Sequence, residues 1–487
     1  MVCHYNVHQI CLASTVSPND PVAPKAVRKD VQHHQKELFR SRFETLTNGC
    51  LGNINNNSPN PLLVPEQFRG DAAKLHEALV IGLTSIVERW WTDEQAAFPC
   101  RMPLEPHEED LLYWVHEQTL ERNMRPFKEC QGHWRTDLLL STEWPSAVRI
   151  CEINARYSIN AQILAAYGYE IYETMAAERG CLFAGADAKQ FLESQLDLFD
   201  PQYPVHILND QYRTPFIDLF VSYEEQNTGL RPVIFKPSDL RLVKDPSSKT
   251  GYALFCKSTG ECPDLIDVDG EHLDRVYQTG IHLYQHEFRL MPVEILRHVA
   301  LCCVNDMRSI LLIHDKRILG LLLQELDSLV IEQRVLTVEQ AEILRQGIVP
   351  TINPGSLELE NLIEQSKKLA PIKDSYIIKP VRSGRGDGIL LGKELSQTQW
   401  ETLLIDQRDP KLAPDRRVYI IQPLIKQPVF ELLDQHGKVR ASHLVGSSHL
   451  ANGKFTGLGV WRAGGTKVCN VNSGGFWMLS VIGRPNQ

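Results

Sequence analysis

The sequence lacks any long apolar run. No uncharged apolar stretch reaches the roughly 20 residues that a membrane helix requires, and residues 1–15 show no basic segment followed by an apolar core. Lys and Arg do not gather in clusters and the net charge is -9, so we expect no nucleic-acid-binding surface. These absences predict a cytoplasmic protein that binds neither membrane nor nucleic acid. They do not indicate the oligomeric state.

The sequence also lacks the cysteine spacing of a zinc site. Its 12 cysteines are scattered, with one adjacent pair at Cys302 and Cys303 and no C-x-x-C repeat. We expect reduced thiols that are mostly buried. The 43% hydrophobic and 23% charged content is that of an ordinary globular protein, and 487 residues suffice for two to four structural units.

The order of expected helices and strands favours an α+β fold. Residues 1–65 are polar, and the run Asn53–Pro61 predicts a loop, so this stretch is interpreted as a variable N-terminal extension. Residues 71–91 predict an amphipathic helix, because apolar residues recur at steps of three and four. They are Leu75, Leu79, Leu83, Ile86 and Trp90. Later strands and helices mix without a strict βαβ rhythm, which argues against a doubly wound sheet.

Several short runs predict strands. The alternating run 148–154 is one, and residues 232–256 predict a hairpin that turns through 244–251. Residues 309–313 are expected to form a strand that leads into a helix. Further strands are expected at 375–379, 417–422, 441–445 and 457–461.

A glycine-rich segment follows one of these strands. The strand ends at Lys379, and Gly384, Gly386 and Gly388 then alternate with other residues before a second strand begins. Glycines allow the backbone to approach phosphate oxygens, and a lysine at the strand end supplies a point charge. The segment is neither a Walker A loop nor a dinucleotide fingerprint, because no Gly-Lys-Ser/Thr follows and no helix begins there. It predicts a flexible loop over a phosphate, with a ligand-free hairpin as the alternative.

The strand at 417–422 carries one amide, Gln422, and is broken by Pro423. Backbone groups left unpaired at such a break could hydrogen-bond an adenine edge. The alternative is an ordinary core strand that ends at the proline.

A possible metal motif lies far upstream. Glu152 and Asn154 are two apart on a predicted strand and therefore project to the same face. Together with Asp137 they offer hard oxygen donors, which suit Mg²⁺ with ATP better than zinc. Arg135, two residues before Asp137, could neutralise a transferring phosphoryl group.

Taken together, these motifs resemble the circularly permuted ATP-grasp ligases, in particular the synthetase domain of glutathionylspermidine synthases. In that group the metal motif comes first and the glycine loop last, as it does here. The resemblance extends from about residue 134 to 475. It implies mixed and antiparallel sheets in two lobes that sandwich ATP, with 66–300 carrying the metal motif and substrate region and 301–487 the nucleotide lobe.

The resemblance also implies roles for individual residues. Asp137, Glu152 and Asn154 match magnesium ligands, and Arg135 matches the transition-state arginine. Lys316 and Lys379 match the two nucleotide lysines, and Arg462 stands where a substrate- or phosphate-contacting arginine is expected. The glycine loop and Gln422 complete the implied nucleotide site.

The implied reaction joins a small-molecule carboxylate to an amine at the expense of ATP. The chain departs from the group after Asn154, where Ala155-Arg156-Tyr157 replaces the common Asp-Thr-Pro, and no amidase domain precedes the motifs. These departures leave the acid and the amine unidentified. A nucleotide-binding protein without turnover and a phosphotransferase without amine coupling remain alternatives.

Overall fold

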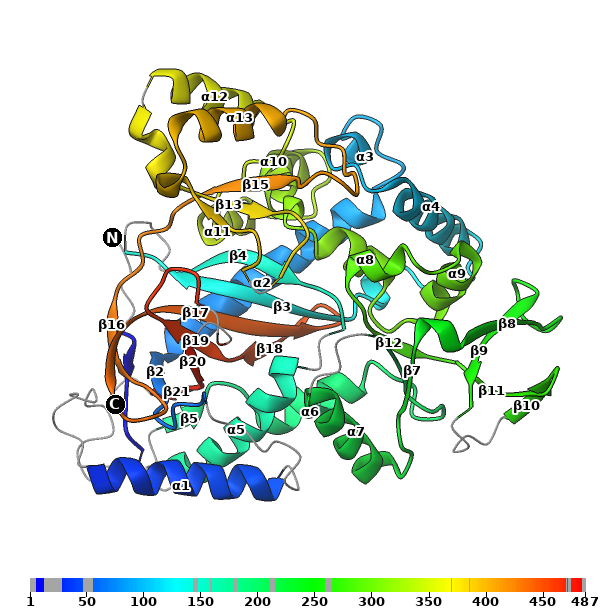
Figure 1. Cartoon of the computed structure of the whole chain (residues 1–487), viewed down its shortest axis with the longest axis horizontal. Helices are drawn as coiled ribbons and strands as arrows, with labels where there is room; N and C mark the ends of the chain where they lie inside the picture. Colours follow the sequence, from blue (N-terminus) through cyan, green and yellow to red (C-terminus); the bar gives the residue numbers. More distant parts are fainter. Residues whose placement is uncertain are drawn as a thin grey trace.

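The computed structural model describes residues 6–12, 29–46, 56–142, 148–157, 160–177, 182–210, 215–258, 265–368, 370–384, 386–469, 471 and 474–483. Helices and strands intermix over several sheets, which confirms the α+β prediction (Figure 1). Within these ranges no helix combines the length and the apolar character needed to cross a bilayer. Five of the eight cysteines described there are buried, namely Cys11, Cys130, Cys151, Cys256 and Cys469.

A seven-stranded sheet lies at the centre of the molecule (Figure 1). Its long middle strand, β17, pairs with β3, β19, β16 and β18. The sheet comprises β3 (His133–Leu140), β4 (Val148–Asn154), β16 (Phe430–Leu433), β17 (Val439–Ala451), β18 (Lys454–Leu458), β19 (Trp461–Gly464) and β20 (Phe476–Met478). Strands from both predicted lobes therefore join in one sheet, and the boundaries of those lobes remain a prediction.

Helix α2 (Glu66–Glu88) packs beside this sheet and against α10 (Arg317–Ile331) and α11 (Val338–Gly347). The predicted apolar face is confirmed, because all five of its residues are buried: Leu75, Leu79, Leu83, Ile86 and Trp90. His76 of α2 contacts Thr136 of β3, with 2.6 Å between Nε2 and Oγ1. Side chains alternate along a strand. Arg135 and Asp137, the two neighbours of Thr136, therefore face the opposite side of the sheet.

Trp461 of β19 packs on the face of the central sheet that lies against α2. Its side chain is fully buried, its ring lies 5.8 Å from that of Phe68, and a Cβ added at Gly446 would come within 2.8 Å of it. Trp461→Ala should therefore lower the free energy of unfolding by about 3–5 kcal/mol, as large core truncations do. Urea and thermal unfolding midpoints measure this. The exposed Leu290→Ala serves as control, and equal midpoints for both variants would contradict the assignment.

A smaller sheet carries the glycine-rich segment. It has the order β14-β13-β15, all antiparallel, with β13 (Tyr376–Pro380), β14 (Leu390–Leu391) and β15 (Tyr419–Pro423). Helices α12 (Leu357–Lys368) and α13 (Gln397–Asp406) cover it around the buried Trp400 (Figure 1). The predicted arrangement of strand, glycine segment and second strand is confirmed.

Three further sheets complete the fold. The first, β1-β2-β21-β5, contains β1 (His8–Gln9), β2 (Leu62–Pro65), β5 (Leu182–Ala184) and β21 (Ser480–Gly483). The second, β12-β6-β7, contains β6 (His206–Asn209), β7 (Val233–Phe235) and β12 (Thr279–His282). The third, β10-β11-β9-β8, contains β8 (Leu240–Lys244), β9 (Tyr252–Lys257), β10 (Leu265–Val268) and β11 (Glu271–Arg275). The remaining α-helices are α1 (Lys29–Leu46), α3 (Phe98–Arg101), α4 (Pro106–Leu120), α5 (Asn160–Ala177), α6 (Ala188–Leu196), α7 (Pro215–Thr228), α8 (Gln285–Phe288) and α9 (Val293–Cys302).

Three strand predictions were wrong in part. The strand expected at 457–461 is divided between the end of β18 and the start of β19, with Gly459 and Val460 outside both. Residues Ser309–Ile313 form a π-helix rather than a strand, because all five are buried and a short run that is apolar on every side has no period to separate the two structures. The hairpin predicted at 232–256 is confirmed for β8 and β9 alone, since β7 pairs in parallel with β6 in another sheet. Within residues 1–65, helix α1 was not predicted; its Phe39 and Phe43 are buried.

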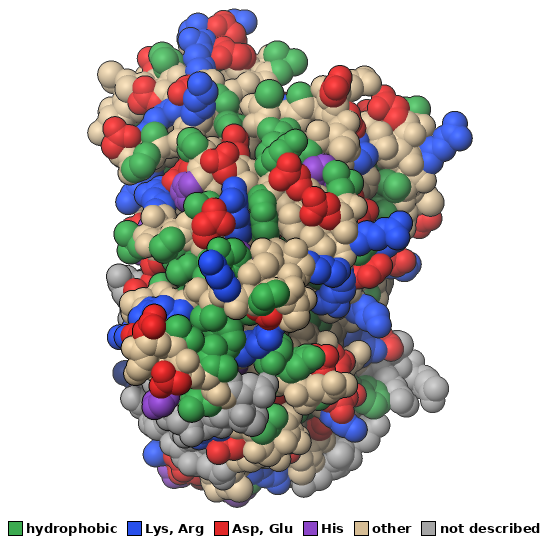
Figure 2. All heavy atoms as spheres, turned by 90° about the vertical axis from the view of Figure 1, so that its right-hand side faces the viewer, with side chains coloured by type: hydrophobic (Ala, Val, Ile, Leu, Met, Phe, Trp, Pro, Cys, Tyr) green, Lys and Arg blue, Asp and Glu red, His purple; other side chains and the backbone are tan. Residues whose placement is uncertain are grey.

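The face that lies on the right in Figure 1 carries β8 to β11. On it, basic and acidic side chains are interspersed, and apolar side chains form small groups between them (Figure 2). Charges of the two signs therefore offset one another across this face.

Candidate active site

A cavity of about 270 Å³ lies between the central sheet and the sheet of β13. One part of its wall is charged or polar and the other is apolar. The charged and polar residues include Arg135, Asp137, Glu152, Asn154, Lys379, Gln422, Gln427, Arg462 and Lys467. The apolar ones are Leu139, Val349, Ile377, Ile389, Pro423, Leu424, Ile425, Val445 and Val468.

The predicted metal motif is assembled by the pairing of β3 with β4. Asp137 lies opposite Glu152, and Arg135 lies opposite Asn154. Cross-strand partners share a face, so these four side chains all project into the cavity. An irregularity in the pairing follows directly after Asp137. The sequence motifs R-x-D and E-x-N are separated by the 14 residues between Asp137 and Glu152, and the pairing of the two strands brings them into one cluster.

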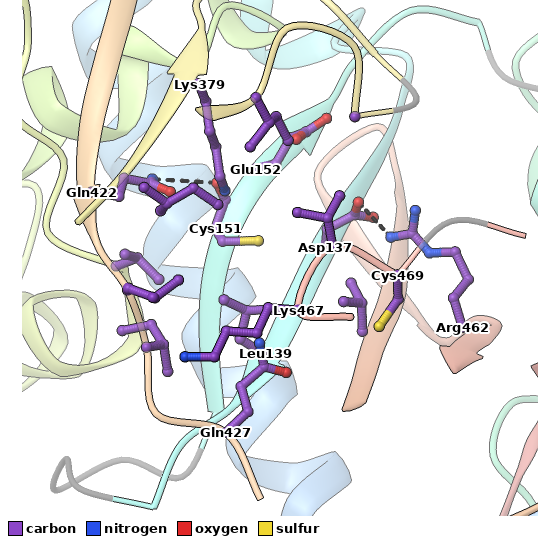
Figure 3. Close-up of a pocket in the computed structure, with 18 of the residues that line it drawn as sticks. Asp137, Leu139, Cys151, Glu152, Lys379, Gln422, Gln427, Arg462, Lys467 and Cys469 are labelled. Carbon is purple, nitrogen blue, oxygen red and sulfur yellow. Dashed lines mark hydrogen bonds and ion pairs between the residues drawn. The ribbon is translucent and has the colours of Figure 1, made fainter. Parts of the chain in front are cut away.

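Asp137 is held between two arginines. Its Oδ2 accepts a hydrogen bond from Arg462 Nη2 at 2.5 Å (Figure 3). Its Oδ1 lies 3.3 Å from Arg135 Nε. Burial by itself would raise the pKa of Asp137, but Arg462 and then Arg135 outweigh it and hold this pKa below its ordinary value. The carboxylate is therefore ionised at neutral pH.

One buried polar atom of this cluster, Asn154 Nδ2, has no partner, whereas Arg135 Nε and Asp137 Oδ1 form an ion pair with each other without a hydrogen bond. Buried polar atoms in proteins are nearly always paired, so unpaired atoms in a cavity indicate a place where a ligand supplies the partner. The amide nitrogen of Asn154 is a donor, which suits an anionic oxygen of a ligand.

Lys379 and Gln422 enter the cavity from the smaller sheet. Lys379 of β13 is 6% exposed, and Figure 3 shows its side chain reaching toward Glu152 and Cys151. Gln422 of β15 instead anchors the two sheets to each other, because its Nε2 donates to Thr351 Oγ1 at 2.9 Å and to the Cys151 carbonyl at 3.4 Å. Gln422 lines the cavity, so the nucleotide role predicted for it stays a prediction. Its amide nitrogen is already used in the hydrogen bonds that join the two sheets.

The glycine segment curves over the cavity. Gly384 and Gly386 line it, and Gly386 and Gly388 have φ of 78° and 71°, values that favour glycine. Gly388 is not among the lining residues and packs against Arg417 and Pro380.

Lys316 lies behind this segment rather than in the cavity wall. Its Nζ donates to the Ser383 carbonyl at 2.7 Å and lies 3.8 Å from Glu152 Oε1, and its backbone N–H donates to the Val381 carbonyl at 3.2 Å. Lys316 therefore ties the start of the glycine segment to the metal motif.

Arg382, at the start of the same segment, is held by carboxylates. Its Nη1 donates to both oxygens of Glu108 at 2.6 Å, and its Nε donates to Asp315 at 3.1 Å. Asp315 also pairs with Arg317 at 2.8 Å and is fully buried. Burial alone would raise the pKa of Asp315, but Arg317 and Arg382 outweigh it and lower this pKa from 3.8 to about 2.

Removal of the Asp315 carboxylate should destabilise the folded protein. Asp315→Asn leaves two buried guanidinium groups without their shared counter-charge, so we expect a loss of about 3–5 kcal/mol in the free energy of unfolding at pH 7. Because the folded pKa is the lower one, the ionised carboxylate stabilises the fold above about pH 4 and ceases to do so as the pH falls toward about 2.

Urea unfolding at a series of pH values tests both points. The difference in the free energy of unfolding between wild type and Asp315→Asn should stay constant above about pH 4 and decrease below it. Asp327→Asn, whose side chain is 85% exposed, is the control. A difference in the free energy of unfolding that does not decrease in acid would contradict the pairing of Asp315 with Arg317 and Arg382.

Nine of the eleven predicted site residues meet in the cavity, and Lys316 and Gly388 do not line it. Four polar or thiol lining residues were not predicted: Cys151, Gln427, Lys467 and Cys469. Lys467 and Cys469 follow β19 in a turn that begins Gly464-Gly465, and this glycine pair next to Arg462 was the signal that could have found them. Burial raises the pKa of the Cys151 and Cys469 thiols to about 11 in each case, so neither is a thiolate at neutral pH.

The donor set fits Mg²⁺ bound together with phosphate. Asp137, Glu152 and Asn154 supply oxygen donors, whereas within the described ranges no group of three or more His, Cys, Asp or Glu is placed to hold a metal. Mg²⁺ commonly uses one or two carboxylates and completes its shell with water and substrate phosphates.

Comparisons with known proteins show the family of the chain. Residues 75–312 match the family model of the AnkG N-terminal domain. The chain is 36% identical over 502 aligned residues to the ATP-grasp enzyme ankG of Aspergillus thermomutatus, and the alignment covers 98% of this chain and 100% of that protein. The resemblance to ATP-grasp proteins inferred from the motifs is therefore confirmed. The chain belongs to the AnkG family of ATP-grasp enzymes.

A search of solved structures gives a more distant likeness. A candidate gamma-glutamylcysteine synthetase of Methylobacillus flagellatus KT aligns over 83% of this chain and 88% of its own, with 10% identity and a TM-score of 0.34. A likeness at this level transfers neither a site nor an activity.

Proposed function

We propose that the protein is an ATP- and Mg²⁺-dependent ligase that activates a carboxylate as an acyl phosphate and couples it to an amine. One observation carries the proposal. Three oxygen donors (Asp137, Glu152 and Asn154), the buried Lys379 and two arginines converge in a single cavity beneath a glycine-rich segment. A relative over the whole chain is an ATP-grasp enzyme, which supports ATP as the nucleotide.

The order of residues along β3 suggests how ATP lies. Leu139, Asp137 and Arg135 project into the cavity in turn, about 6–7 Å apart per step. Leu139 belongs to the apolar part of the wall with Leu424 and Ile425, which suits a purine ring. The phosphates would then extend past Asp137 and Glu152 toward Arg135. This placement corresponds to ATP held between two sheets, as the circularly permuted arrangement implies.

The chain's own residues would act by charge and position. Lys379 and the backbone at Gly384 and Gly386 would bind phosphate oxygens. Asp137, Glu152 and Asn154 would hold Mg²⁺, which neutralises phosphate charge when bound. Arg135 and Arg462 would stabilise the negative charge that builds up around the transferring phosphoryl group.

The proposed reaction proceeds in two steps. A carboxylate oxygen of the acid forms a bond to the γ-phosphorus as the bond to the β–γ bridging oxygen breaks, which gives an acyl phosphate and ADP. The amine nitrogen next attacks the acyl carbon, phosphate departs, and the amine loses a proton. Closure of the glycine segment would keep water from the acyl phosphate.

ADP release measured with panels of acids, with and without amines, tests the proposal. We expect ADP release that requires Mg²⁺ and an acid, and an amide product only when an amine is also present. ADP release without any amide would indicate a phosphotransferase. Binding of ATP with no ADP release under any condition would indicate a nucleotide-binding protein without turnover.

A further inference from the structure

A second cavity, of about 200 Å³, shares no lining residue with the candidate active site. It lies between the end of α2, the helix α4 and the segment that carries the π-helix. Most of its lining side chains are apolar, and three of them are aromatic: Trp90, Trp91 and Phe127. An apolar wall with a few polar groups is the usual lining of a small-molecule site.

The two indoles of this wall are held in place by neighbouring rings. Trp90 stacks on Phe98 with 5.6 Å between ring centres, and Trp91 meets Tyr113 edge-on at 5.4 Å. Side chains that are already fixed lose little conformational freedom when a ligand binds. The aromatic part of the cavity is therefore formed in advance.

The charge that this cavity offers to a ligand is negative. Glu88 is exposed, takes part in no ion pair among the described residues, and accepts a hydrogen bond from the Lys128 backbone N–H at 3.3 Å. Arg308 is balanced by Asp306, to which its Nε and Nη2 donate at 2.8 and 2.7 Å. Burial and then Arg308 lower the pKa of His116 against a smaller opposing effect of a neighbouring glutamate, so this imidazole is uncharged at neutral pH. One carboxylate charge, that of Glu88, is left over.

Helix α4 connects the second cavity with the start of the glycine segment. Its Glu108 accepts hydrogen bonds from Arg382 Nη1 at 2.6 Å. Leu112 and His116 follow Glu108 at steps of four residues, on the same face of the helix, and both line the second cavity.

The π-helix makes a second connection. Its Leu312 lines the second cavity, and the chain continues from this helix directly to Asp315 and Lys316. Asp315 accepts from Arg382 Nε at 3.1 Å, and Lys316 Nζ donates to the Ser383 carbonyl at 2.7 Å. The two elements that enclose the second cavity thus also hold the first residues of the glycine segment.

We propose that the second cavity is an effector site for a small organic ammonium ion with an aromatic or aliphatic body. The indole faces of Trp90 and Trp91 attract a cation, and Glu88 supplies the counter-charge. A ligand seated between α4 and the π-helix restrains both elements and, through them, the start of the glycine segment, so it strengthens nucleotide binding. The ligand site is independent of the proposed function, whereas its effect on the nucleotide rests on it.

Three probes of similar size and different charge test the site: phenethylamine, 2-phenylethanol and 3-phenylpropionate. Each is titrated by calorimetry without nucleotide. Wild type should bind the amine at least about tenfold more tightly than the alcohol, and the anion most weakly. Glu88→Gln should lower the affinity for the amine by about tenfold and leave that for the alcohol unchanged. Trp91→Ala should weaken the binding of both.

The effector role is tested by the affinity for a non-hydrolysable ATP analogue. Saturating phenethylamine should raise this affinity by about fivefold in wild type and leave it unchanged in Glu88→Gln. Glu77→Gln, which changes an exposed glutamate of the same helix, is the matched control and should behave as wild type in both experiments.

The outcomes separate this inference from the proposed function. Equal affinity for the three probes, or a preference for the amine that persists in Glu88→Gln, overturns the site. Binding of the amine with no change in analogue affinity overturns the effector role. Absence of analogue binding under every condition counts against the proposed function, and the titration of the amine without nucleotide then still decides the site.

Discussion

Glu152→Gln is expected to reduce ADP release by about 1,000-fold or more. The change keeps the shape of the side chain but removes one of the two carboxylate charges of the cluster, and loss of several kcal/mol of stabilisation at the transferring phosphate corresponds to this factor. Glu152 lies on the cavity wall opposite Asp137 and 3.8 Å from Lys316. Its loss should also leave Lys316 without its carboxylate neighbour.

Steady-state ADP release as a function of Mg²⁺ concentration measures the effect. If Glu152 binds the metal, excess Mg²⁺ should recover part of the lost activity, whereas a residue with a purely structural role would give no such recovery. The exposed Glu77→Gln on α2 is the control and should retain full activity. Unchanged unfolding midpoints must accompany the loss. Full activity in Glu152→Gln would remove the metal assignment.

Lys379→Met should raise the KM for ATP by about 100-fold. The lysine is buried at the end of β13 beneath the glycine segment, and truncation of one partner of a buried charge pair costs about 2–5 kcal/mol. Methionine retains the length and the apolar stem, so packing between the two sheets should persist.

Titration with a non-hydrolysable ATP analogue separates binding from turnover in this variant. Affinity should fall in Lys379→Met and remain at the wild-type value in Lys368→Met, an exposed lysine of α12. Added salt should weaken analogue binding by wild type more than by Lys379→Met, because the variant has already lost the charge. Equal affinities in both variants would place the phosphates elsewhere.

The two predictions concern different walls of one cavity. Glu152 stands on the central sheet and Lys379 on the smaller sheet, so both effects together would require a ligand that touches the two sheets at once. A strong effect in only one variant would place the nucleotide against a single wall.

Local patterns in the sequence were sufficient for several elements. The helical period of Leu75, Leu79 and Leu83 predicted α2 and its buried face, and the alternation at 148–154 predicted β4 with correct bounds. Both signals arise from residues within one element, where the spacing of side chains is set by the element's own geometry. The π-helix at Ser309–Ile313 could not be predicted in this way. All five of its residues are buried, so the spacing of apolar residues does not distinguish a helix from a strand.

The part of the candidate site that could be predicted consists of short motifs in which two polar side chains have a fixed spacing along a strand. Arg135 and Asp137, and likewise Glu152 and Asn154, are two apart on strands and must share a face. The sequence could not show that these two strands are neighbours in register, or that Arg462 donates to Asp137 from 325 residues further along the chain. Such contacts depend on the pairing of distant strands.

The sequence by itself thus identified the glycine-rich segment, the lysine that precedes it and the three oxygen-bearing side chains, Asp137, Glu152 and Asn154, that line the cavity. Tertiary structure alone decided that Lys316 binds the Ser383 carbonyl at the start of that segment rather than lining the cavity, and that Lys467 and Cys469 join the wall. The physical reason is the same in each case. A side chain's chemistry is fixed by its type, but its partners are set by which strands and loops the core brings together.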